Sequence, residues 1–234
     1  MSQTDSRGPR SSLLMSVEDL ASALRPSAGG AEGEAGLVVV DCRFNLLKPE
    51  AGRAAWLEGH IPGAFYADLN QDLSSPPRPD TGRHPLPDPE QLRTLLGGFG
   101  IGKATRVVAY DEGGGGLAAR LWWLLRWMGH GPVVLLDGGF SAWQTAGLPV
   151  DRDVPALRTR RFEGQPGQMP VRDASQVAAG LAIVMLMIFA TRPEMLNEIS
   201  AGTFTTIFWA MVGTIPPLKR LTSVQSQLQK GIAA

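Results

Sequence analysis

The sequence is poor in cysteine and has no excess of charge of either sign. A single cysteine, Cys42, stands among 234 residues, which excludes an internal disulfide and a cysteine-based zinc site. Basic and acidic residues both number 22, so the formal net charge is zero. Nucleic-acid-binding proteins usually carry a basic excess, and we expect no nucleic-acid partner. The first sixteen residues hold no apolar stretch of signal-peptide length, so we expect no secretion signal.

The composition changes sharply near residue 172. The preceding part is rich in arginine, aspartate, glycine and proline and contains short apolar runs, whereas charge almost vanishes from Val177 onward. We therefore expect a disordered N-terminus at residues 1–13, one domain at 14–172, and a helical region of different character at 173–234.

The first part alternates between short apolar runs and helical segments. Predicted strands cover 37–41, 106–110 and 133–137, and predicted helices cover 16–24, 90–99, 118–128 and 141–146. Such alternation is typical of an α/β fold in which helices cover both faces of a parallel sheet.

Four glycines, Gly113, Gly114, Gly115 and Gly116, lie between a predicted strand and a predicted helix. The backbone N–H groups of such a loop can bind an anion. No Gly-Lys-Ser/Thr follows the glycines, so the loop is not an ATP-binding P-loop. We consider it a candidate anion loop without an ATP site.

A dinucleotide-binding function is one alternative for this loop. Gly113, Gly115 and Ala118 fit the pattern G-x-G-x-x-A, and Asp137 follows 24 residues after Gly113. However, Asp111 and the glutamate beside it would repel a pyrophosphate at the mouth of the loop. We therefore expect no nucleotide cofactor.

Six motifs in register carry a more specific resemblance. They are VVVDCR (38–43), GHIPGAFYADL (59–69), TGRHPLPDPE (81–90), VVAYD (107–111), ARLWWLLRWMGH (119–130) and LLDGGFSAWQTAGLPV (135–150). Residues 14–176 closely resemble the N-terminal half of tandem-domain rhodaneses, the thiosulfate and 3-mercaptopyruvate sulfurtransferases. The resemblance implies a rhodanese-like α/β fold.

The resemblance also implies what the glycine loop does. In the active domain of this family the loop begins with a cysteine that carries sulfane sulfur to a thiophilic acceptor, whereas Asp111 occupies that position here. The chain therefore resembles the non-catalytic domain and lacks the expected nucleophile. The implied partners are a small sulfur-containing anion or a second rhodanese domain, with no cofactor or metal.

Two further residues are candidates for function. Cys42 could replace the missing nucleophile, although a small buried side chain is the alternative at this strand end. His84 matches a position that lies at the domain interface, beside the active site, in mercaptopyruvate sulfurtransferases. Its expected acidic partner is Asn70 here, which argues against a His–Asp relay. We expect Arg43 to form an ion pair that fixes the end of a strand.

The last part of the chain carries two uncharged stretches, 177–190 and 199–218, followed by an amphipathic segment at 219–234. Two such stretches predict a transmembrane hairpin, with inner-membrane anchoring through 177–218 and a cytoplasmic location for 1–172. Residues 178–234 resemble the last two transmembrane helices of lipid A flippase-type ABC exporters, except that Pro216 stands where an arginine is typical.

Three hypotheses follow from the sequence. The chain is a rhodanese-like module that lacks its nucleophile, a membrane-anchored fragment of an ABC lipid exporter with a passenger domain, or a non-natural fusion with neither activity. The rhodanese resemblance is longer and rests on more independent motifs, so the first hypothesis leads.

Overall fold

The computed structural model describes residues 13–25, 36–79, 81–158 and 160–190, and the isolated residues 202, 206 and 209. The chain divides into two compact units, Met1–Pro170 and Val171–Ala234, and each is described by itself. The N-terminal segment that we expect to be disordered falls almost wholly in residues 1–12, outside the described residues.

The first unit is built on a five-stranded sheet in which every described pair of strands is parallel. The spatial order is β1-β5-β4-β2-β3, with bounds β1 Leu14–Met15, β2 Leu37–Asp41, β3 Phe65–Tyr66, β4 Arg106–Tyr110 and β5 Val133–Leu136. The three central strands confirm the sequence prediction. The two edge strands have only two residues each, too few to produce a pattern in the sequence.

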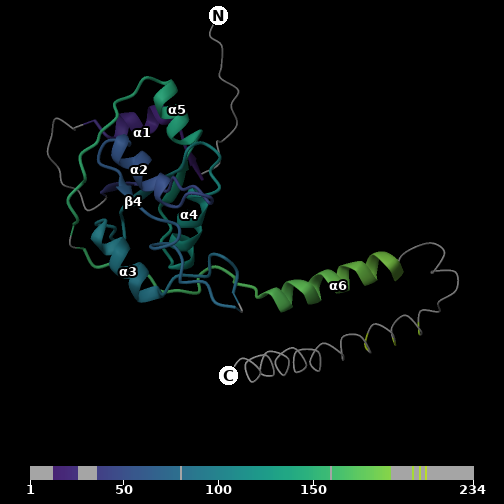
Figure 1. Cartoon of the computed structure of the whole chain (residues 1–234). Coiled ribbons are helices and arrows are strands. Elements are labelled where there is room, and N and C mark those ends of the chain that lie inside the picture. The colour runs from purple at the N-terminus through teal and green to yellow at the C-terminus, as the bar shows by residue number, and fades with distance from the viewer. Residues whose placement is uncertain are drawn as a thin grey trace, which may run out of the picture. The chain divides into compact units, whose positions relative to one another are not determined.

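Five helices accompany the sheet: α1 Val17–Ala23, α2 Glu50–Glu58, α3 Pro89–Gly98, α4 Ala118–Trp127 and α5 Gly139–Thr145. Buried side chains of α1 and α5 share one core cluster, and those of α3 and α4 share another. In Figure 1, α1 and α5 accordingly lie together at one end of the domain, away from α3. The predicted parallel sheet with helices on both faces is confirmed.

The alternation of side chains along the central strands produces these two clusters. Val39 and Val108 pack with α1 and α5, whereas Val38, Val107 and Ala109 pack with α3 and α4. Successive residues of a strand point to opposite faces, so an uninterrupted apolar run supplies both sides of a doubly covered sheet. This is why, apart from the exposed Arg106 at the start of β4, the central strands contain no polar residue before Asp41 or Tyr110.

The second unit contains one described helix, α6 Ala174–Ala190. Its 17 residues span about 26 Å at 1.5 Å per residue, less than the roughly 30 Å of a bilayer core. Among the described residues, no helix is long and apolar enough to cross a membrane. The expected transmembrane hairpin therefore has no support here, and its second stretch, 199–218, lies almost wholly outside the described residues, as does the segment 219–234.

Packing around α2 generates a test of the fold. A Cβ atom at Gly52 would clash with the carbonyl oxygen of Arg43 and lie 2.7 Å from the hydroxyl of Tyr66. Alanine normally stabilises a helix by about 1 kcal/mol relative to glycine. We expect Gly52→Ala to have the opposite sign and to lower the free energy of unfolding by about 1–3 kcal/mol, because overpacking outweighs helix propensity.

Urea unfolding followed by circular dichroism measures this difference. Gly82→Ala is the matched control, because a Cβ atom there meets nothing within 4 Å and should change stability by less than about 0.5 kcal/mol. A Gly52→Ala variant that is as stable as the unchanged chain would show that α2 does not pack against the end of β2 in this way.

Candidate functional site

The glycine loop between β4 and α4 closes around the side chain of Asp111. One carboxylate oxygen, Oδ1, accepts hydrogen bonds from the N–H groups of Gly113 at 3.0 Å and Gly115 at 2.9 Å. The other, Oδ2, accepts from Leu117 at 2.9 Å and Ala118 at 3.2 Å. Asp111 is only 4% exposed. The loop thus does gather backbone donors around an anion, and the anion is the protein's own carboxylate.

The turn before α5 holds this loop from the outside. Phe140 N donates to the carbonyl oxygen of Asp111 at 2.8 Å, and Ser141 N donates to that of Glu112 at 2.9 Å. Gly139, immediately before Phe140, has φ +58°, and a Cβ atom there would approach Gly113 to 2.9 Å. Only glycine allows the turn to approach so closely in this backbone conformation.

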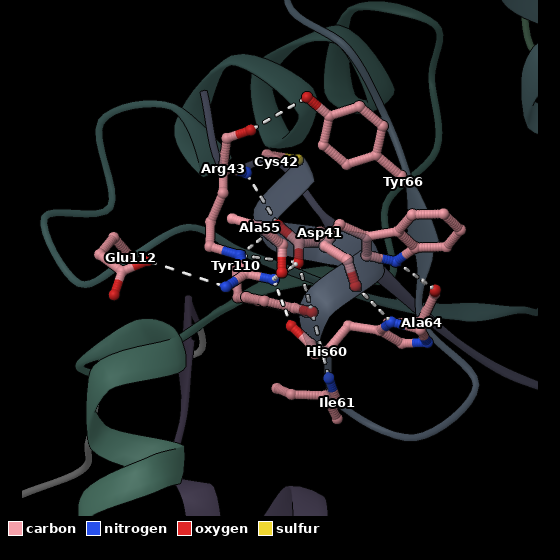
Figure 2. Close-up of polar contacts among 12 residues, drawn as sticks. Asp41, Cys42, Arg43, Ala55, His60, Ile61, Ala64, Tyr66, Tyr110 and Glu112 are labelled. Atoms are coloured by element: carbon pink, nitrogen blue, oxygen red, sulfur yellow. Dashed lines mark hydrogen bonds and ion pairs between the residues drawn. The ribbon is translucent and has the colours of Figure 1, made fainter. Parts of the chain in front are cut away.

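A buried ion pair lies beside the loop at the end of β2. Arg43 Nε donates to Asp41 Oδ1 at 3.1 Å and Oδ2 at 2.9 Å, and Tyr110 donates its hydroxyl to Oδ2 at 2.8 Å (Figure 2). The ion pair predicted for Arg43 is therefore confirmed. Burial raises the pKa of the Asp41 carboxyl, while the neighbouring guanidinium acts in the opposite direction.

The guanidinium of Arg43 also reaches the surrounding elements. It donates to the carbonyl oxygens of Ala55 at 3.2 Å and Gly59 at 2.7 Å, and it lies 4.1 Å from the centre of the Phe140 ring. Figure 2 shows its further contact with Glu112, at 3.9 Å. Arg43 thus ties the end of β2 to α2 and to the glycine loop, and its Nε and Nη2 donors are used within the protein.

Cys42 lies inside the domain. Its side chain belongs to the core cluster of α3 and α4 and is 2% exposed. Burial, together with the carboxylates of Asp41, Asp111 and Asp72, raises the pKa of the thiol well above its usual range. A thiol that stays protonated and is inaccessible is a poor nucleophile. This geometry favours the interpretation of Cys42 as a small core side chain.

His84 borders a pocket of about 440 Å³ that is separate from the glycine loop. The pocket is lined by Phe44, Leu46, Asn70, Ser74, Ser75, Pro77, Arg83 and His84. The imidazole Nε2 of His84 lies 3.0 Å from Oδ1 of Asn70. Partial burial, followed by the positive charges of Arg120 and Arg83, lowers the pKa of His84. A neutral ring that donates to an amide oxygen is consistent with these contacts.

Arg120 fixes the segment that carries His84, and the sequence did not single it out. From the first turn of α4 it donates to the carbonyl oxygens of Leu73 at 3.1 Å, His84 at 3.2 Å and Pro85 at 2.9 Å. The arginine in the motif ARLWW gives no sign of this role, because the three carbonyl groups lie 35 to 47 residues away in the chain. Arg120 is a positioning residue for the pocket.

The fold and the loop define a class of protein: a parallel α/β domain with an anion-holding loop between β4 and α4. A family model for the rhodanese-like domain matches residues 28–146. The chain belongs to this family, which confirms the rhodanese resemblance, and its relatives are sulfurtransferases.

Three relatives illustrate the similarity. A probable 3-mercaptopyruvate sulfurtransferase of Pseudomonas aeruginosa is 42% identical over 186 residues, which cover 79% of this chain and 63% of that protein. The human 3-mercaptopyruvate sulfurtransferase is 39% identical, over 65% of this chain and 50% of that protein. The crystal structure of SseA from Escherichia coli aligns with a TM-score of 0.58 and 27% identity, over 70% of this chain and 60% of that one. The chain thus spans less than two thirds of each relative's length.

The contact between His84 and Asn70 generates a prediction. Asn70→Asp places a carboxylate at hydrogen-bonding distance from the imidazole, and an opposite charge favours the protonated ring. We expect the pKa of His84 to rise above its value in the unchanged chain, as measured by NMR titration of the imidazole protons. Gln144→Glu, which adds the same charge on the exposed side of α5, should leave the titration midpoint in place. Equal midpoints in all three proteins would contradict the contact.

Proposed function

We propose that this rhodanese-type domain does not transfer sulfur by itself and instead completes the site of a second, cysteine-bearing rhodanese domain. The observation that carries the proposal is the buried carboxylate of Asp111, which accepts four backbone hydrogen bonds at the position of the family's nucleophile.

The chemistry of sulfur transfer supports the loss of activity. A thiolate attacks the outer sulfur of thiosulfate, an S–S bond forms as sulfite leaves, and the resulting persulfide then passes its outer sulfur to an acceptor such as cyanide. A carboxylate cannot form this S–S bond. The only thiol of the chain, Cys42, is buried. The domain therefore cannot carry out the first step of the reaction, the attack of a thiolate on the sulfur donor.

The occupied loop also argues against a free anion as the ligand at Gly113–Gly116. The carboxylate of Asp111 is covalently tethered to the loop, so its effective concentration there far exceeds that of a small anion in solution. Displacing it would also leave a buried carboxylate without hydrogen-bond partners, which is costly. Of the two partners that the resemblance implies, we therefore favour a second rhodanese domain.

The His84 pocket supports this choice of partner. Leu46 and Leu47 near its rim are 54% and 91% exposed, and exposed apolar side chains are typical of an interaction surface. A docking domain would cover these leucines. The sulfur donor we infer is 3-mercaptopyruvate or thiosulfate, the compounds named for the relatives.

The hypotheses for residues 173–234 stay predictions. Membrane anchoring through 177–218, the exporter fragment and the non-natural fusion all depend on the second apolar stretch, which lies almost wholly outside the described residues. None of the contacts that support the rhodanese-type function involves that region.

An activity assay tests the loss of chemistry. We expect the purified chain to form no thiocyanate from thiosulfate and cyanide, and no sulfide from 3-mercaptopyruvate and a thiol, above the rate in buffer. Asp111→Cys should instead gain one sulfur atom on incubation with either donor, detected by mass spectrometry, because the loop's N–H groups would stabilise a thiolate. Asp111→Ser is the matched control and should gain none.

The same assay includes Cys42→Ser in both backgrounds. Asp111→Cys should keep its sulfur uptake without Cys42. Turnover by the unchanged chain that disappears on Cys42→Ser would contradict the proposal and identify Cys42 as a relocated nucleophile.

A complementation experiment tests the partner. The cysteine-bearing half of the Pseudomonas aeruginosa relative, produced separately, should transfer sulfur from 3-mercaptopyruvate faster when this chain is added. His84→Ala should remove most of the stimulation, whereas Arg53→Gln, an exposed change on α2, should preserve it. A rate that this chain leaves unaffected at all concentrations would refute the proposed partnership.

A further inference from the structure

A groove unconnected with sulfur chemistry lies along α3. It has a volume of about 930 Å³ and is lined by Glu90, Arg93, Thr94, Gly97, Gly98, Leu157, Arg158, Arg160, Arg161, Phe162, Glu163 and Gln165. One wall is the segment 157–165, here called the strap, in which residue 159 lies outside the described residues. Three arginines fall within four residues of the strap, in a chain whose formal net charge is zero.

The strap is held in place without these three guanidinium groups. Its backbone N–H groups at Arg158 and Arg160 donate to the carbonyl oxygens of Gly98 at 2.8 Å and Gly97 at 3.2 Å, at the end of α3. A side chain at Gly97 would clash with the carbonyl oxygen of Arg160, so glycine permits this approach. Phe162 anchors the strap in the core and is 5% exposed.

A fourth arginine completes the attachment. Arg93 Nε donates to the carbonyl oxygen of Gly164 at 2.9 Å, and Arg93 also pairs with Glu90. Arg158, Arg160 and Arg161 are exposed, and within the described part of the chain no carboxylate or carbonyl oxygen accepts from their guanidinium groups. With Arg93 and Glu90 paired, the remaining charged residues that line the groove are these three arginines and Glu163, so its lining carries a net charge of +2 (3 − 1).

We propose that this groove binds a ligand with a chain of phosphate groups, such as inorganic polyphosphate or the phosphate chain of a nucleotide. A guanidinium group recognises phosphate oxygens through paired N–H donors. Arg158 and Arg161 are three residues apart, which corresponds to about 10 Å at 3.3 Å per residue of extended backbone and exceeds the size of one isolated sulfate or phosphate.

The dimensions favour a small ligand over an acidic protein. Small-molecule sites enclose roughly 300–1,000 Å³, a range that includes this groove. A stable protein interface instead covers about 800 Å² on each partner, with an apolar centre. A purely structural role is the competing explanation, because positive charges favour the C-terminal end of a helix such as α3.

Isothermal titration of the full chain with inorganic tripolyphosphate, in metal-free buffer, tests the proposal. We expect saturable binding that weakens with added salt and falls at least about tenfold in the variant R158Q/R160Q/R161Q, because three charge-assisted contacts are lost. The variant R25Q/R53Q/R106Q removes the same charge from exposed positions elsewhere and should bind like the unchanged chain. Absence of saturable binding, or equal weakening in both variants, overturns the proposal.

Two further measurements separate the explanations. Urea unfolding should give the same stability for both triple variants, and a strap variant that is destabilised without losing affinity would support the structural role instead. If the glutamine variant does not fold, the tripolyphosphate affinity of R158K/R160K/R161K is measured instead. Lysine keeps the charge but lacks the paired N–H donors of arginine. An affinity equal to that of the unchanged chain would therefore overturn recognition by arginine. ATP should bind through the same three arginines, and binding of adenosine alone would contradict a phosphate-directed site.

Discussion

The ion pair between Asp41 and Arg43 is the contact on which the functional end of the domain depends. Asp41 is completely buried, and a buried carboxylate is tolerated only when it is paired and hydrogen-bonded. Arg43 satisfies it and also binds the carbonyl oxygens at the end of α2, while Tyr110 reaches it from the neighbouring strand. Removing one partner of such a pair typically costs about 3–5 kcal/mol, because the other charge stays buried alone. The carboxyl ends of β2 and β4 are thereby held together, and the glycine loop begins immediately after β4.

The loop that begins there illustrates how one geometry can serve reactivity or stability. Converging N–H groups lower the free energy of any anion placed among them. With a cysteine at the first position, the favoured anion is a thiolate or a persulfide, and the site is reactive. With Asp111 the same donors are satisfied permanently by an inert carboxylate. The substitution keeps the loop folded and the nearby turn at Gly139 in place while it removes the chemistry.

The sequence predicts the parts of this fold that depend on local pattern. Apolar runs mark the three central strands, and Ser16, at the start of the first predicted helix, is the side-chain N-cap of α1. The edge strands are too short to show a pattern. Helix α2 was not predicted, because it begins without a side-chain N-cap and contains a glycine whose tight packing against the end of β2 is visible only in three dimensions.

The candidate site shows the same limit. The position of Asp111 follows from the rhodanese resemblance, but the four hydrogen bonds that close the loop depend on backbone geometry. Arg120 was missed entirely, because its partners are carbonyl groups of a segment far away in the sequence. Long-range contacts between a side chain and backbone carbonyls leave no residue pattern, and a single sequence cannot indicate them.

The distribution of charge connects the loop, the pocket and the strap. At the carboxyl ends of the strands each buried charge has an internal partner: Arg43 for Asp41, and backbone N–H groups for Asp111. In the pocket, Asn70 replaces a carboxylate beside His84, so the imidazole has no anionic partner at hydrogen-bonding distance that would favour its protonation. Unmatched positive charge is concentrated instead on the strap, which is held by its backbone and by Phe162. A domain that neutralises its own anion loop has no strong electrostatic attraction left there for a free anion. A free anion instead meets positive charge at the exposed arginines of the strap, and these line a groove that includes neither the glycine loop nor His84.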